Sequence, residues 1–176
     1  MDIPSIKAIQ KKEYKELFEL IQQNRDHLKR FFPITLSNTN STRETKRYVK
    51  SLLEKLSRKE LFPMGIYHQE ELVGMVYIKN IDWKIPKCEI GYFIGQSSEG
   101  KGLMTKTLGL ATSYCFEELK MIKVFLRISP ANLGSLAVAQ KNGFEKEGLL
   151  RKEFRIETDE LIDVEYHGKL NPNHLS

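Results

Sequence analysis

The stretch from Lys87 to Leu119 constrains the fold of this chain most strongly, because its pattern changes twice. Residues 88–94 are apolar and rich in β-branched and aromatic side chains, which predicts a strand. Residues 95–102 contain three glycines and predict a loop. A stripe at helical spacing then predicts a helix: Leu103, Thr107, Leu108, Ala111, Tyr114, Cys115 and Leu119. A strand, a glycine-rich turn and a helix N-terminus together favour phosphate binding, because unpaired N–H groups and the helix dipole attract anions.

One known loop of this kind is the P-loop of nucleotide hydrolases. Gly95-x-x-x-x-Gly100-Lys101 nearly completes its motif, but Gly102 stands where Ser or Thr would hold Mg²⁺. The next predicted strand, 123–128, runs into Ser129 and Pro130 rather than an aspartate that could complete a metal site. A nucleotide hydrolase is therefore disfavoured.

A different family fits the loop better. Residues 99–105, EGKGLMT, resemble the pyrophosphate loop of the GNAT acetyltransferases, which binds coenzyme A. Glu89-Ile90-Gly91-Tyr92 resembles the fourth strand of their RimJ/RimL branch, the N-terminal acetyltransferases of ribosomal proteins. The superfamily usually has Gln or Arg three residues before the first glycine of this loop, where this chain has Ser97. Backbone donors do most of the phosphate binding, so this departure bears mainly on affinity.

A second signature follows the strand at 123–128. Asn132-x-x-Ser135 precedes a short helical pattern that ends at Asn142-Gly143, and Phe144 begins another strand. The RimJ/RimL branch commonly has Asn-x-x-Ser, a short helix and a Gly-Phe in this order. Gly143 is the expected helix stop, because glycine readily takes the left-handed conformation required there.

The rest of the chain predicts alternating short elements. The expected strands are 5–10, 64–67, 72–81, 123–128, 144–155 and 161–169, and the expected helices are 11–23, a segment of 24–33 ended by Pro33, and one opened by the capping box Ser41-x-x-Glu44. Residues 33–40 predict a polar loop. The resemblance implies an α/β (α+β) GNAT fold: a mixed, mostly antiparallel central sheet of about seven strands, flanked by helices and split near the cofactor. We expect a single domain over residues 1–176.

Composition excludes several classes of protein. The net charge of +5 is spread along the chain, which is typical of a solvated surface and does not indicate direct nucleic-acid binding. Neither a membrane span nor a signal peptide is predicted, and the two cysteines, Cys88 and Cys115, are expected to be buried thiols of a cytoplasmic protein. The four histidines show no metal-ligand spacing, so we expect no metal. The oligomeric state stays open, with a homodimer as one option.

The resemblance implies acetyl-CoA as co-substrate and assigns residues to its binding. Backbone N–H groups of Phe93 and Ile94 would polarise the thioester carbonyl, and Asn132 would hydrogen-bond the pantetheine arm or order its own turn. The loop residues implied in binding the cofactor are Glu99, Gly100, Lys101, Gly102, Leu103 and Met104.

Acetyl transfer needs a neutral amine and a proton for the leaving thiolate. Glu89 is the candidate base, acting through water, with a surface carboxylate or a structural ion pair as the alternative. Ser135 is the candidate for protonating the thiolate, with a helix N-cap as the alternative. Tyr166 is a further candidate acid, although core packing is favoured for it.

The acceptor is predicted less sharply than the donor. Phe31 and Phe32 occupy the position of an Asn-Arg-x-x-Leu-x-x-aromatic stretch that lies beside the acceptor cleft in RimJ/RimL-like proteins, with core packing as the alternative. An α-amine has a pKa near ~8 and is easily deprotonated at neutral pH. A lysine amine has a pKa near ~10.4, so its deprotonation at neutral pH costs about 4–5 kcal/mol. We therefore expect the N-terminus of a ribosomal protein as acceptor. A polyamine or aminoglycoside, or a non-catalytic CoA-binding module, are the alternatives.

Overall fold

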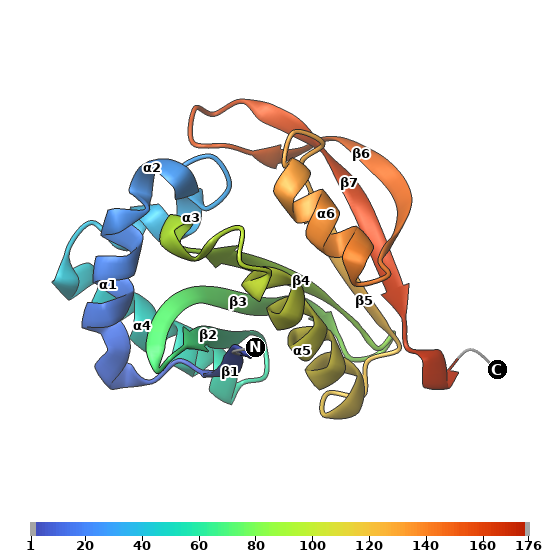
Figure 1. The fold of residues 1–176 in the computed structure, drawn as a ribbon, viewed down its shortest axis with the longest axis horizontal. Helices are drawn as coiled ribbons and strands as arrows, with labels where there is room; N and C mark the ends of the chain where they lie inside the picture. The colour runs from blue at the N-terminus through green and yellow to red at the C-terminus, as the bar shows by residue number, and fades with distance from the viewer. Residues whose placement is uncertain (1–2, 175–176) are drawn as a thin grey trace.

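The computed structural model describes residues 3–174, which contain a seven-stranded sheet in the order β1-β2-β3-β4-β5-β7-β6 (Figure 1). The strands are β1 (Ser5–Ala8), β2 (Phe62–His68), β3 (Glu71–Asp82), β4 (Lys87–Ile94), β5 (Lys123–Ile128), β6 (Glu145–Arg155) and β7 (Leu161–Leu170). Every neighbouring pair is antiparallel except β4 and β5, which are parallel. The expected mixed, mostly antiparallel sheet of about seven strands is confirmed.

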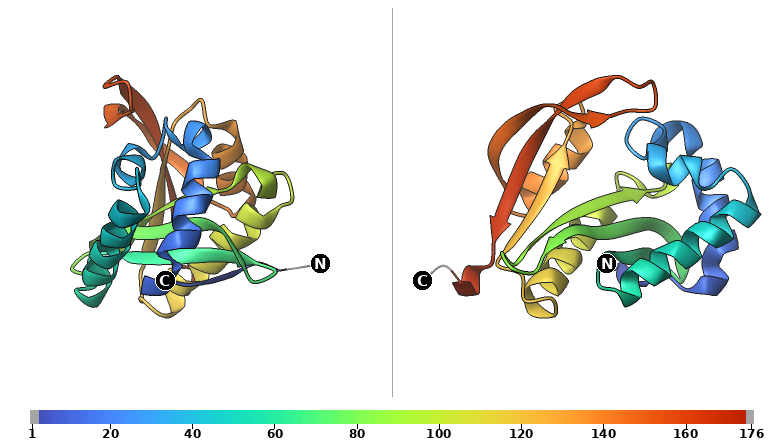
Figure 2. Two further views of the ribbon diagram at one scale, coloured as in Figure 1. Left: turned by 90° about the vertical axis from the view of Figure 1, so that its left-hand side faces the viewer. Right: turned by 180° about the vertical axis from the view of Figure 1, so that it is seen from behind.

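The sheet is split between its two parallel strands. β4 and β5 pair only from Lys87↔Lys123 to Glu89↔Phe125, although both strands continue beyond these residues. β4 stays paired with β3 as far as Gly74↔Ile94, while β5 stays paired with β7 as far as Ile128↔Glu165. Figure 2 shows the two halves of the sheet diverging. Residues 90–94 of β4 therefore have no β5 backbone to bond with.

Helices cover both faces of the sheet. On one face, α1 (Tyr14–Gln23), α2 (Arg25–Leu28), α3 (Pro33–Ser37) and α4 (Thr42–Ser57) bury Leu17, Ile21, Leu28, Leu36 and Val49 against Met75, Tyr77 and Phe93 of the sheet. On the other face, α5 (Leu103–Glu117) and α6 (Leu133–Lys141) bury Leu108, Ala111, Cys115 and Ala139 against Ile90, Val124 and Leu126. Short 3₁₀ turns occur at η1 (Lys11–Glu13), η2 (Gln96–Ser98) and η3 (Pro172–His174).

The segment between α2 and α4 differs from its prediction. The sequence predicted that Pro33 ends a helical segment and that residues 33–40 form a polar loop. In the structure, Pro33 instead begins α3. Proline is well suited to the first position of a helix, since its missing N–H would have no partner there and its φ is already helical. Thr35 and Leu36 of this helix are buried, which supplies the packing that a sequence pattern of five residues cannot reveal.

The predicted helix ends and thiols agree with the structure. The Ser41 hydroxyl accepts a hydrogen bond from the Glu44 backbone N–H at 3.2 Å, as the first half of a capping box requires. Glu44 closes the turn differently, because its carboxylate accepts from the backbone N–H of Asn40. Gly143 has φ +72°, so the predicted helix stop is confirmed. Cys88 and Cys115 are buried free thiols. Within residues 3–174, every helix is too short or too polar to span a lipid bilayer.

Candidate functional site

The loop after β4 presents an open cradle of backbone groups. Gly100 and Gly102 have φ of +71° and +73°, and a Cβ added at either position would meet no atom within 4 Å. Gly102 is also the N-cap residue of α5, and no side chain caps this helix. The N–H groups of its first turn are therefore available to an anion, with the positive end of the helix dipole behind them.

Contacts with α1 and α2 hold this loop in place. The backbone N–H of Gln96 donates to Asn24 Oδ1 at 2.8 Å, and Asn24 Nδ2 donates to the Leu20 carbonyl at 2.7 Å. His27 Nε2 lies 3.0 Å from Glu99 Oε1, at the far side of the loop. The loop is thus tied to the helices at both ends, although its glycines carry no side chains.

A cavity of about 750 Å³, here called the loop cleft, extends from these glycines to α6. Three cationic side chains on its wall, Lys29, Arg30 and Lys141, suit a phosphorylated ligand. Eight of the nine residues predicted to bind the cofactor line this cleft, namely Phe93, Ile94, Glu99, Gly100, Gly102, Leu103, Met104 and Asn132. Lys101, the ninth, is exposed and is not part of this lining.

A second cavity of about 1070 Å³ lies among α3, α4 and the turn of the β6–β7 hairpin, and is here called the hairpin cleft. Its wall combines aromatic and aliphatic side chains with charges of both signs. Among the residues that line it are Arg25, Phe31, Phe32, Tyr48, Tyr77, Lys79, Asn80, Arg127, Phe154 and Glu157.

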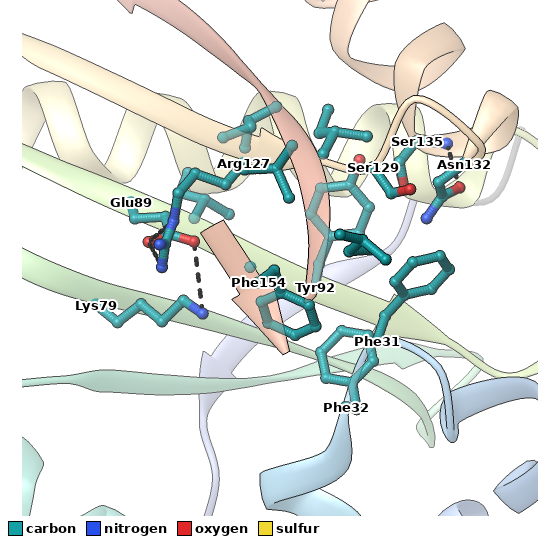
Figure 3. Close-up of a pocket in the computed structure, with 16 residues that line it drawn as sticks. Phe31, Phe32, Lys79, Glu89, Tyr92, Arg127, Ser129, Asn132, Ser135 and Phe154 are labelled. Atoms are coloured by element: carbon teal, nitrogen blue, oxygen red, sulfur yellow. Dashed lines mark hydrogen bonds and ion pairs between the residues drawn. The ribbon is translucent and has the colours of Figure 1, made fainter. Parts of the chain in front are cut away.

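A small cavity of about 100 Å³, the central cavity, lies at the split in the sheet and shares lining residues with both clefts (Figure 3). Phe31 and Phe32 line all three cavities, and the Phe32 ring packs edge-on against Phe93, with centroids 5.2 Å apart. Both residues therefore line cavities, and Phe32 also packs against the core, while their contact with an acceptor stays a prediction. The split also brings Glu89 and Ser135 to this one cavity, where they lie on opposite sides (Figure 3).

Glu89 is buried, with only 5% of its side chain exposed, and its two oxygens are used unequally. Oε2 accepts from Asn80 Nδ2 at 2.6 Å and from Arg127 Nε and Nη2 at 3.1 and 3.0 Å. Oε1 has a looser ion pair with Lys79 Nζ, at 3.5 Å. The predicted alternative of a structural ion pair is thus present in the structure, and Oε1 is the oxygen with capacity left to accept a proton.

Arg127 connects this carboxylate with the β6–β7 hairpin. Its Nη1 lies 3.1 Å from Glu153 Oε1, so one guanidinium bridges two carboxylates on different strands. Burial lowers the pKa of Arg127, but the charge and hydrogen bonds of Glu89 and Glu153 raise it above its ordinary value on balance. The cation is therefore permanent, and it fixes the position of Glu89.

The turn before α6 corrects one alternative for Ser135. Asn132 is the N-cap residue of this helix, and its Oδ1 accepts from the Ser135 backbone N–H at 3.0 Å. The prediction that Ser135 itself caps the helix is wrong. The helix begins at Leu133, so Ser135 lies inside its first turn and Asn132 occupies the N-cap position. Asn132 orders the turn, as one of its two predicted roles required, and the Ser135 side chain is left free to face the central cavity.

Tyr166 takes no direct part in this arrangement. Its ring stacks on Phe125 with centroids 4.6 Å apart, and it lines none of the three cavities. Burial raises the pKa of Tyr166 to about 12. Packing, the role favoured from the sequence, accounts for this residue.

Several residues of the site were missed from the sequence. Arg127 is a cation between the apolar residues Leu126 and Ile128 of the predicted strand, which is a usable signal for a buried partner. Lys79 and Asn80 come at the end of a strand and carry no such signal. Tyr92 belongs to the quoted Glu89-Ile90-Gly91-Tyr92 motif, yet its position at the junction of the loop cleft and the central cavity follows only from the fold. Residues 3–174 contain no group of three or more His, Cys, Asp or Glu suited to a metal ion.

Comparison with known families and proteins agrees with this geometry. Residues 5–145 match the family model described as acetyltransferase (GNAT) domain. The probable N-acetyltransferase YjcK of Bacillus subtilis (strain 168) is 30% identical over 154 residues, which cover 86% of this chain and 85% of that protein. The putative ribosomal N-acetyltransferase YdaF of the same organism is 32% identical over 149 residues, covering 84% and 80%. Spermidine N(1)-acetyltransferase of Escherichia coli (strain K12) is 33% identical over 86 residues, covering 49% and 46%.

Solved structures share the fold over nearly the whole chain. A crystal structure of a probable acetyltransferase, 27% identical, superimposes with a TM-score of 0.89 and covers 98% of this chain and 96% of its own. The structure of Mycobacterium smegmatis RimJ in complex with CoA-disulfide is 18% identical, has a TM-score of 0.90 and covers 98% and 84%. At that identity the second likeness concerns the fold alone.

Proposed function

The chain belongs to the GNAT family of acetyl-CoA-dependent N-acetyltransferases, and we propose that its acceptor is the N-terminal α-amine of a ribosomal protein. The observation that carries this proposal is the meeting of two large clefts at a small central cavity that holds both Glu89 and Ser135. A donor reaching the cavity from one side and a peptide N-terminus from the other would meet there. The name of YdaF, a putative ribosomal N-acetyltransferase, supports the same acceptor class.

The loop cleft suits coenzyme A in size and chemistry. Its glycines leave room for close approach to the backbone, the uncapped N-terminus of α5 offers N–H groups, and Lys29, Arg30 and Lys141 supply positive charge. We therefore assign the diphosphate to Gly100–Gly102 and the thioester end to Phe93, Ile94 and the central cavity. Acetyl-CoA supplies there an acetyl thioester, whose carbonyl carbon an amine can attack.

The roles proposed for the chain's own residues follow from the two faces of β4. Successive side chains of a strand point to opposite faces, so Glu89 and Gly91 share the face of Phe93, while Tyr92 shares that of Ile90. Glu89 Oε1 takes the proton of the amine through a water molecule on the acceptor side. Ser135 Oγ donates to the leaving sulfur on the donor side. Backbone N–H groups of residues 90–94 that lack a β5 partner can bind the carbonyl oxygen.

The charge of the hairpin cleft favours a peptide over a polyamine. Arg25, Lys79 and Arg127 line it, and the carboxylate nearest the central cavity, Glu89, is already held by Lys79, Arg127 and Asn80. Of the three carboxylates that line the cleft, Asp159 and Glu60 form ion pairs with Arg155 and Arg58, and the third is Glu157 at the hairpin turn. A polyamine would bring several further cations to this wall, whereas a peptide N-terminus brings one amine on an apolar or polar chain.

Acceptor choice is tested by measuring acetyl-CoA turnover with a panel of amines. We expect peptides with the N-terminal sequences of ribosomal proteins to give a higher kcat/KM than spermidine or an aminoglycoside. The matched control is each peptide with its α-amine blocked and its lysines free, which should not be turned over. Faster turnover of spermidine would favour the small-amine alternative, and CoA binding without turnover of any amine would favour a non-catalytic module.

Replacing Ser135 by alanine should lower kcat and leave the affinity for acetyl-CoA nearly unchanged, because the lost hydroxyl acts only when the sulfur leaves. The melting temperature should hold, since Asn132 and not Ser135 caps α6. Asn132→Ala is the matched control for capping and should cost about 0.5–2 kcal/mol of stability. Normal kcat in a protein with Ser135→Ala would remove this serine from the reaction.

A further inference from the structure

The hydroxyl of Tyr92 is buried, and no residue in the described part of the chain lies at hydrogen-bonding distance and angle to it. A phenol in such a position loses its bonds to water without replacement, which normally costs stability. Hydroxyl groups of this kind are uncommon in folded proteins, and each one calls for a physical reason. Phenylalanine would fill the same space without that cost.

The position of Tyr92 indicates the reason. It lines both the loop cleft and the central cavity, on the same face of β4 as Ile90, beyond the last pair between β4 and β5. In Figure 3 its ring points toward Ser129, which follows β5, and toward Ser135 in the first turn of α6. The Ser135 hydroxyl is close enough to influence the ionisation of the phenol. The two side chains therefore face each other where the donor thioester is assigned.

We propose that Tyr92 is a positioning residue for acetyl transfer: when the donor thioester is bound, the Tyr92 hydroxyl, which is unpaired in the structure, donates a hydrogen bond to Ser135 Oγ and so turns the serine proton toward the leaving sulfur. Serine hydroxyls rotate freely unless a neighbour fixes them, and Oγ can accept one bond while donating another. A donor behind Oγ also stabilises the negative charge that develops on it as its proton moves.

The step that this pair assists balances without any other reactant. The amine nitrogen forms a bond to the acetyl carbon as the carbon–sulfur bond breaks. The charged acceptor first gives one proton to Glu89 through water, and the neutral amine then attacks. Once bonded to the acetyl carbon, the nitrogen gives its second proton to solvent, while the sulfur gains one from Ser135, which recovers a proton from solvent. Tyr92 keeps its own proton throughout.

The environment of Tyr92 maintains it as a donor. Burial raises the pKa of its phenol to about 12, although the neighbouring Ser135 hydroxyl acts in the opposite direction. The hydroxyl is therefore protonated at every pH at which the enzyme would work, so it stays able to donate to Ser135 and does not itself supply the proton. This distinguishes it from a titrating catalytic acid.

The test is Tyr92→Phe, which removes the hydroxyl and keeps the ring. We expect kcat to fall about tenfold, the effect of one hydrogen bond made in the transition state. Calorimetric affinity for CoA should not change, and the melting temperature should hold or rise because an unpaired buried hydroxyl is lost. Thr112→Val is the matched control, since Thr112 also buries an unpaired hydroxyl, in α5 and outside the three cavities. It should leave both kcat and CoA affinity unchanged.

A second arm asks whether Tyr92 acts through Ser135. In a protein already carrying Ser135→Ala, the added Tyr92→Phe should lower kcat little further, because the hydroxyl that it positions is gone. Equal losses in both backgrounds, or wild-type kcat in the single variant, would overturn the proposal. The inference rests on acetyl transfer but not on the identity of the acceptor. If spermidine proves to be the amine accepted, the kcat of each variant relative to its parent is measured with spermidine.

Discussion

Replacing Glu89 by glutamine is expected to lower kcat by about 10²–10⁴ at pH 6.5, the range usual for the loss of general acid–base assistance. Glutamine keeps the shape of the side chain and can still accept hydrogen bonds, but it cannot take up the proton of the amine. The loss should shrink as pH rises and largely vanish around pH 8–9. Near and above its reference pKa of about 8, a growing share of an α-amine acceptor is already neutral. The measurement is a pH–rate profile with a saturating N-terminal peptide.

The buried ion pair makes a control essential for this variant. Removing one partner of such a pair can cost about 3–5 kcal/mol, so Glu89→Gln should also melt at a lower temperature. Arg127→Gln disrupts the same pair and keeps the carboxylate. It should destabilise the protein as well, yet it should not show the large loss of kcat at pH 6.5, because the Glu89 carboxylate is still present. Wild-type rates for Glu89→Gln at pH 6.5, or a loss equally large at every pH, would make Glu89 structural.

A valine at Gly100 is expected to weaken acetyl-CoA binding by more than tenfold. The branched side chain would occupy the open space through which the diphosphate approaches the backbone, and losing even one charge-assisted hydrogen bond there costs about 1.5–3 kcal/mol. The backbone adds strain, because φ at this position is +71° and valine tolerates it poorly. Isothermal titration calorimetry with CoA measures the loss directly.

Gly148→Val provides the matched control for Gly100→Val. A Cβ at Gly148 also meets no atom within 4 Å, but φ there is not in the left-handed region and the residue lies in β6, outside the loop cleft. CoA affinity should be unchanged in this variant. Unaltered CoA binding by Gly100→Val would contradict the assigned diphosphate site. Tight binding of Mg-ATP by the wild-type protein, with no binding of CoA, would restore the P-loop alternative.

Most of the helices and strands could be predicted from the sequence, because each is determined by residues close together in the chain. The strand, loop and helix of residues 87–119, the Ser41 cap and the Gly143 stop each depend on side chains within a few residues of one another. The helix at Pro33–Ser37 escaped prediction because it is short and depends on tertiary packing. Ser135 was taken as a possible cap since serine suits that position, but the chain placed Asn132 there instead.

The candidate site was only partly predictable because its contacts join distant segments. Glu89 bonds to Arg127, 38 positions away, through the short parallel pairing of β4 and β5, and Arg127 continues to Glu153 on β6. A sequence shows each charge but not which charges meet. Likewise, the motif containing Tyr92 was recognised, whereas the unpaired state of its hydroxyl depends on the surroundings that the fold creates. The catalytic roles of Glu89 and Ser135 stay predictions on which these experiments bear.

The most direct test of the account is mass spectrometry of a ribosomal protein substrate after incubation with this enzyme and acetyl-CoA. Unmodified ribosomal proteins would be supplied with free N-termini, and tandem spectra would locate any added acetyl group. The account predicts one acetyl group on the α-amine of at least one of these proteins, added about 10²–10⁴ times more slowly when the enzyme carries Glu89→Gln at pH 6.5. Acetylation confined to lysine side chains, or no acetylation while spermidine is turned over in parallel, would contradict it.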